Sequence, residues 1–260
     1  MSGARLKCEA ASADIAARQS AVVLSWMMRW SSAQLLRTAE FAYAIVALFA
    51  LTQGPVYRLW NASAALAEKL PAPTIAHAHF ATFVAVQIPA VLLWFRRADT
   101  GWLRARPNQA LILFMAWLGL SVLWSAFARQ SMPDYVALVL TTCFGLYLAA
   151  SFSLREFWWV VSLAMALGVG VSWLSVMRLW DGAVNLQEDY WIGIYGNRNS
   201  LAPVTAMAII AAVGVVLSSP QLRTRRLSLE SALTVLFAVA LVFFAVVELW
   251  NSGSQTSPAA

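Results

Sequence analysis

The sequence predicts an all-α, polytopic integral membrane protein with about seven transmembrane helices. Of its 260 residues, 61% are hydrophobic and only 12% are charged, and the mean hydropathy is +0.68. This composition leaves too little polar surface for a soluble domain of that length. The 13 tryptophans fit the same class, because many of them lie near predicted helix ends, where amphipathic rings favour the bilayer interface.

The predicted helices are apolar runs of roughly 20 residues, the length that a helix needs to cross a hydrocarbon core of about 30 Å. They cover approximately residues 36–52, 75–95, 109–127, 134–152, 157–177, 200–218 and 231–250. Turn and breaker residues separate the runs, among them Gln53-Gly54-Pro55 and Met132-Pro133-Asp134. The chain is therefore expected to comprise an N-terminal segment 1–35, a transmembrane helical domain 36–250 and a tail 251–260.

The distribution of Lys and Arg predicts the orientation. If the N-terminus is cytoplasmic, 13 of the 18 basic residues fall on the inner side and five on the outer side, which is the asymmetry that membrane insertion favours. The loop 178–199 and the C-terminal tail then lie on the outer face. The net charge of +6 is read as a topology signal, so we expect a lipid bilayer as partner and no nucleic acid.

A polar segment precedes the sixth predicted helix. Its sequence is Trp191-Ile-Gly-Ile-Tyr-Gly-Asn-Arg-Asn-Ser-Leu-Ala-Pro203, which sets Arg198 between two asparagines. We expect the helix to begin at Asn199 or Ser200, since either side chain can cap the free backbone N–H groups. The partial positive charge of the helix N-terminus then adds to the charge of Arg198.

This arrangement predicts a site for an anionic ligand. Gly193 and Gly196 let the backbone bend and approach a ligand closely, and the planar guanidinium group of Arg198 suits phosphate oxygens. A phosphate group at the membrane surface therefore fits the segment. A purely structural interpretation fits the residues equally well: Arg198 reaches toward lipid headgroups while the asparagines cap the helix.

Other polar residues give weaker signals. Glu248 lies near the outer end of the seventh predicted helix, where an acid in lipid is costly, so it faces either a polar cavity or, as we favour, the nearby interface. His77 and His79 lie two residues apart and point to different faces of a helix, which favours a structural role. Cys8 and Cys143 have no metal-ligand spacing, and we expect no metal or cofactor.

Three motifs occur in a recognisable order. A Trp124-Ser125 pair ends a helix, Trp-x-Gly-x-Tyr-Gly-Asn-Arg-Asn-x-Leu-Ala at 191–202 opens another, and a Ser-x-Ser-x-Thr element, Ser252-Gly-Ser-Gln-Thr256, follows one helix later. Their order, spacing and membrane side resemble the O-antigen ligase and O-antigen polymerase superfamily of bacterial envelope proteins. The likeness covers roughly residues 110–257.

The resemblance implies metal-independent glycosyl transfer on the outer face of the bacterial inner (cytoplasmic) membrane. A glycan passes from an undecaprenyl-diphosphate carrier to an acceptor during lipopolysaccharide or exopolysaccharide assembly. The acceptor is the lipid A core for a ligase and the growing glycan for a polymerase, and both fit. Arg198 would contact the carrier diphosphate and stabilise the charge that builds on it. The substrate-binding positions carried over are Trp191, Tyr195, Gly196, Asn197, Arg198, Asn199 and Gln255.

The chain departs from the family pattern in two ways. Members commonly have an arginine in the Ser-x-Ser-x-Thr element, where this chain has Gln255, an uncharged hydrogen-bond donor. Members also continue through further helices and a large outer loop with a histidine base, so no catalytic residue is assigned here. We expect either an N-terminal portion or truncated, degenerate member, or a chain whose C-terminal half is supplied separately. A membrane transporter or flippase subunit and a non-catalytic membrane scaffold stay open as alternatives.

Overall fold

A computed structural model describes most of the chain, in seven stretches. These are residues 34–61, 72–97, 106–178, 183–185, 190–195, 198–219 and 228–253. The structure is mostly helical, at 88%. Contacts divide the chain into two units, Met1–Ala44 and Ile45–Ala260, and the site described below lies wholly within the second unit.

Within the described stretches, six helices are long and apolar enough to cross a membrane. Their spanning parts are Gln34–Leu51, Phe80–Arg97, Ala128–Ser151, Leu154–Met177, Asn199–Ser218 and Leu229–Asn251. A shorter apolar helix covers Asn108–Trp124, where the sequence predicts the transmembrane helix 109–127. The predicted class, a helical protein with several membrane-spanning segments, is thus confirmed.

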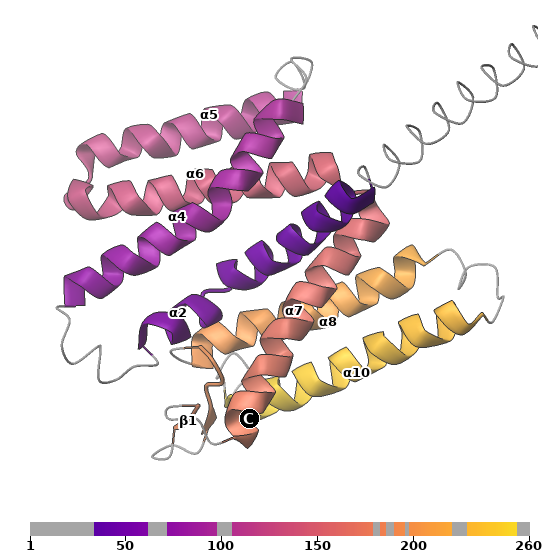
Figure 1. Ribbon diagram of the computed structural model, residues 1–260. Coiled ribbons are helices and arrows are strands. Elements are labelled where there is room, and N and C mark those ends of the chain that lie inside the picture. Colours follow the sequence, from indigo (N-terminus) through magenta and orange to yellow (C-terminus); the bar gives the residue numbers. More distant parts are fainter. Residues whose placement is uncertain are drawn as a thin grey trace, which may run out of the picture. The chain divides into compact units, whose positions relative to one another are not determined.

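The elements follow in chain order, and Figure 1 labels most of the helices and β1. They are α2 (Gly54–Asn61), α4 (Ala72–Arg97), α5 (Arg106–Ser121), the short 3-10 helix η2 (Val122–Trp124), α6 (Ala128–Ser151), α7 (Leu154–Met177), β1 (Val184–Asn185), β2 (Tyr190–Trp191), α8 (Arg198–Ser218) and α10 (Leu229–Asn251).

Two helices begin where breaker residues predicted linkers. The helix α6 starts at Ala128 and contains Pro133 as its sixth residue, where the proline removes one backbone hydrogen bond of the helix. The helix α2 starts at Gly54 and has Pro55 in its first turn, where the missing N–H would be unpaired in any case. The residue before it, Gln53, adopts a φ of 66°, which makes the sharp turn from the preceding helix.

The helices α7 and α10 start at the same end of the unit. Ser153 and Ser228 cap them, each in a capping box with the residue three positions later. Arg155 at the start of α7 forms an ion pair with Glu230 at the start of α10, with 2.8 Å between nitrogen and oxygen. The two helices therefore run parallel, and α8 runs antiparallel to both, packed against them (Figure 1).

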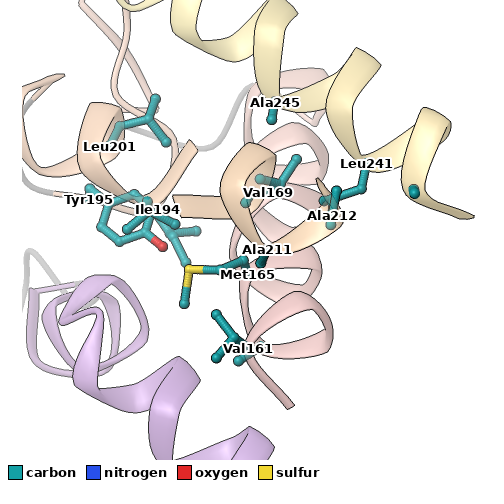
Figure 2. Packing of buried hydrophobic residues seen from close by; sticks show 14 residues of the cluster. Val161, Met165, Val169, Ile194, Tyr195, Leu201, Ala211, Ala212, Leu241 and Ala245 are labelled. Atoms are coloured by element: carbon teal, nitrogen blue, oxygen red, sulfur yellow. The ribbon is translucent and has the colours of Figure 1, made fainter. Parts of the chain in front are cut away.

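Small residues let these three helices approach closely. A Cβ on Gly214 of α8 would lie 2.3 Å from the Trp158 ring of α7, so the indole occupies the space that the glycine leaves. Four alanines are buried on α8, and the buried face of α10 includes the small residues Ser231, Ala238 and Ala245, as is usual for helix contacts in membranes. Figure 2 shows the resulting cluster, in which side chains of α7 face small residues of the other two helices; the labelled members include Val161, Met165, Val169, Ala211, Ala212, Leu241 and Ala245.

Candidate functional site

The segment between α7 and α8 contains a short hairpin. In it β1 pairs with β2 in antiparallel register, with Val184 opposite Trp191. The carbonyl oxygen of Ala183 accepts hydrogen bonds from the N–H groups of Ile192 and Gly193, at 2.8 and 3.0 Å. These bonds fix the chain at the point where the predicted ligand segment begins.

Gly193 lies directly against α7. Its φ is +64°, and a Cβ at this position would lie 2.6 Å from Ser172 Oγ and 2.7 Å from Ser172 Cβ. The N–H of the next residue, Ile194, donates to Ser172 Oγ at 3.5 Å. Only glycine combines this backbone conformation with so close an approach. The glycine that was predicted to let the backbone approach a ligand therefore lets it approach helix α7.

Tyr195 anchors the segment from inside. Its side chain is only 2% exposed, and its hydroxyl donates to Thr52 Oγ1 at 3.2 Å. Gly54 and Gly168 leave the room that the tyrosine fills, and Figure 2 shows the ring next to Ile194 inside the cluster. Burial raises the pKa of the Tyr195 hydroxyl. The ring and hydroxyl of Tyr195 hold the loop in place here. Its predicted contact with a substrate stays a prediction.

Trp191 ties the hairpin to two helices. It is half-buried, and its ring meets that of Trp173 edge-on, with 5.3 Å between centroids. Trp173 in turn contacts the ring of Phe244 at 5.1 Å, and its indole N–H donates to the Phe244 carbonyl oxygen at 3.4 Å. The aromatic contacts thus connect β2, α7 and α10 at one end of the unit.

Arg58 adds a second cation at this loop. Located on α2, it donates from Nη2 to the carbonyl oxygen of Gly193 at 3.0 Å. The two residues are 135 positions apart, so no local sequence pattern indicates the contact. The available signal was its place among the five basic residues that the sequence assigns to the outer side. Arg58 is the residue that sequence reasoning missed.

The helix α8 begins at Arg198, one residue before the earlier of the two predicted starts. Such a difference is within the usual uncertainty of helix ends. Asn199 is exposed in the first turn. The side chain of Arg198 lies outside the described part of the chain, as do Gly196, Asn197 and Gln255, and their assignment as ligand contacts stays a prediction.

Glu248 does not reach the interface, and the favoured prediction was wrong on this point. The side chain is 1% exposed, and neither carboxylate oxygen has a hydrogen-bond partner among the described residues. It lies on the same face of α10 as Leu241 and Ala245, which are buried in the contact with α7 and α8. The side chain is buried because it lies on this packed helix face, although the end of the helix is near.

The Ser-x-Ser-x-Thr element begins beside the hairpin. Ser252 is fully buried, and its N–H donates to the Glu248 carbonyl oxygen at 2.8 Å, which closes the last turn of α10. Gly253 has a φ of +54°, and a Cβ on it would lie 3.7 Å from Tyr190 Cβ. The described start of this element and the loop of the central motif are therefore neighbours.

Comparison with known proteins finds no matching family model, no matching curated protein and no matching solved structure. The functional argument therefore depends on the residues themselves. What they place together is one arginine held on a glycine-containing loop, a second arginine that starts α8, and an apolar bundle below both.

Proposed function

We propose that this chain binds an undecaprenyl-diphosphate-linked glycan at the outer face of the bacterial inner membrane. In this proposal it takes part in transferring the glycan to a lipid A-core or glycan acceptor, as an O-antigen ligase or polymerase does. The supporting observation is the hydrogen bond from Arg58 to the Gly193 carbonyl oxygen. It puts a cation from a distant helix on the loop that leads into Arg198.

Electrostatics favour a diphosphate at this position. A carbonyl acceptor carries no net charge, so the bond to Gly193 leaves the charge of the Arg58 guanidinium in place. The N-terminus of α8 contributes partial positive charge. When the sugar C1–O bond breaks, negative charge builds on the departing diphosphate, and fixed cations stabilise that charge more in the transition state than in the ground state.

The carrier's long apolar chain also has a place to lie. An open apolar cavity of about 590 Å³ lies between α7 and α10, with Trp173 and Phe244 in its wall. Trp173 contacts Trp191 of the hairpin, so the cavity begins next to the loop. A polyprenyl chain that descends from the loop would contact this cavity, whereas a soluble nucleotide would make no use of it.

The acceptor hydroxyl also needs a base. We assign that role to a histidine outside residues 1–260, of the kind that the family resemblance implies. The chain on its own should then bind the carrier without transferring the glycan. A binding assay is consequently a sharper test than an activity assay.

The test is binding of undecaprenyl diphosphate to the full chain in lipid nanodiscs. Arg198→Ala and Arg58→Ala should each weaken binding about tenfold or more, because each removes a charge-assisted contact to phosphate. Arg129→Ala is the matched control, since Arg129 is an exposed arginine at the start of α6 and should leave the affinity within about twofold. Equal affinity in all four proteins would refute the assignment.

Glu248 favours a second candidate, a transporter or flippase subunit. Buried acids within membrane spans often belong to proton or ion pathways, and this one has no partner among the described residues. A flippase would move a fluorescent lipid-linked sugar between the leaflets of vesicles that contain the chain. Glu248→Gln would abolish that movement under this alternative and leave carrier binding unchanged under the first proposal.

A further inference from the structure

A second pocket lies on the far side of α2 from the Gly193 contact. It has a volume of about 340 Å³ and is open on one side. Its walls carry two polar side chains, Gln53 and Asp134, and two phenyl rings, Phe80 and Phe83. These residues come from the turn before α2, from α4 and from α6, so the fold brings together three segments distant in sequence.

Asp134 places a carboxylate on a helix that is mostly apolar. Asp134 is the seventh residue of α6, so its Cα lies about 9 Å along the axis from the helix start. This helix is apolar enough to cross a membrane, and a carboxylate on such a helix is expensive wherever it faces lipid. The open pocket gives the carboxylate a polar space. Gln53 is also strained, with its φ of 66°, since residues other than glycine seldom adopt this conformation.

We propose that this pocket binds one neutral sugar ring. Among the described residues, the wall contains a carboxylate and no Lys or Arg, which disfavours phosphate and favours hydroxyl donors. The Gln53 amide can both donate and accept hydrogen bonds, while the phenyl rings offer apolar area to the C–H face of a pyranose. Small-molecule pockets range from roughly 300 to 1,000 Å³, so a volume of about 340 Å³ suits one ring rather than a chain.

The face of α4 that lines the pocket continues into a buried polar group. Phe80, Phe83 and Gln87 follow the i, i+3, i+7 spacing of a single helix face. Gln87 is fully buried, and its Oε1 has no hydrogen-bond partner among the described residues. The Gln87 amide oxygen, one helical turn beyond Phe83, is therefore available as a hydrogen-bond acceptor on the same helix face.

The sugar subsite lies next to the proposed diphosphate site. Val56 of α2 lines the pocket, while Arg58 contacts Gly193. Residues two apart lie about 200° apart around a helix, whose diameter is about 10 Å. The two sites are therefore separated by about one helix diameter, which an oligosaccharide can bridge. The role of the pocket as a glycan subsite rests on the proposed function, whereas its affinity for a sugar does not.

The experiment is saturation-transfer NMR of methyl glucopyranoside, methyl galactopyranoside and methyl N-acetylglucosaminide with the full chain in phosphatidylglycerol nanodiscs. At least one of the three should bind. Phe83→Ala and Asp134→Ala should each weaken its binding about tenfold or more, because hydrogen bonds to charged groups and ring contacts contribute at that scale. Ala137→Leu fills the pocket without removing any polar group, and should abolish the signal while the chain stays folded.

Two control variants complete the design. Phe127→Ala removes a phenyl ring that is 72% exposed and lies outside the pocket wall, so sugar binding should persist. Arg58→Ala should weaken undecaprenyl diphosphate binding and leave sugar binding intact, which separates a failure of the pocket from a failure of the diphosphate site.

Three results would overturn the inference. The first is the absence of a sugar signal for all three glycosides, and the second is a signal that Ala137→Leu leaves unchanged. The third is displacement of the sugar by ethanolamine together with complete loss of ethanolamine binding in Asp134→Asn, which would make the pocket a site for amine headgroups. A sugar-binding pocket should instead retain measurable affinity in Asp134→Asn, because the amide oxygen still accepts from a hydroxyl.

Discussion

Gly193→Ala should destabilise the protein by an amount that the geometry sets. An alanine at the observed φ of +64° costs about 1–2 kcal/mol in left-handed strain. Its Cβ would also lie 2.6–2.7 Å from Ser172 Oγ and Cβ, and such overpacking costs about 1–3 kcal/mol. We therefore expect the free energy of unfolding to fall by about 2–5 kcal/mol. Reversible unfolding in mixed micelles measures this difference.

A matched glycine and a double mutant make the test specific. Gly170→Ala alters a glycine of α7 that has open space around it, and should leave stability unchanged or raise it by up to about 1 kcal/mol. Ser172→Gly removes the atoms that the new Cβ would meet, so the double mutant should recover about 1 kcal/mol or more as a coupling energy. A cost below about 0.5 kcal/mol for Gly193→Ala, or a coupling near zero, would refute the close packing of loop and helix.

Three further predictions concern buried groups. Because burial raises the pKa of Tyr195, the folded chain keeps this proton at pH values where the unfolded chain loses it. The free energy of unfolding should therefore fall as the pH rises above about 10, and Tyr195→Phe should flatten that dependence; an unchanged slope would contradict the burial. Glu248→Leu removes two buried oxygens without partners among the described residues and should raise the free energy of unfolding by about 1–3 kcal/mol, unless a ligand or ion binds there. Gly214→Ala should lower it by about 1–3 kcal/mol through overlap with the Trp158 ring, whereas Gly145→Ala, which meets open space, should have no such cost.

The sequence was sufficient for the helices that are bounded by clear signals. The apolar runs predicted at 157–177 and 231–250 match α7 and α10 to within three residues, because serine capping boxes define both starts. The prediction failed where Met132-Pro133-Asp134 was expected to be a linker between helices. Pro133 lies inside α6 as its sixth residue, where it removes one backbone hydrogen bond without ending the helix.

Long-range pairing accounts for most of what the sequence left open at the site. Arg58 and Gly193 are far apart in the chain, and helical periodicity contains no information about which segments meet. Glu248 is different, because a signal was present. It shares an i, i+4, i+7 face with Leu241 and Ala245, and the small residues of that face indicate contact with another helix rather than with lipid.

Accessibility of Asn199 tests the central claim most directly. Asn199 is exposed in the first turn of α8, so Asn199→Cys in a chain without Cys8 and Cys143 offers a single thiol. A membrane-impermeant maleimide should label it from the outer side, and undecaprenyl diphosphate should protect it. Leu229 is the first residue of α10 and lies at the other end of the helix bundle from Asn199; it is 78% exposed. Leu229→Cys should be labelled only from the inner side and should not be protected. Labelling of Asn199→Cys from the inner side, or at a rate that undecaprenyl diphosphate leaves unchanged, would contradict an outer-face carrier site at the start of α8.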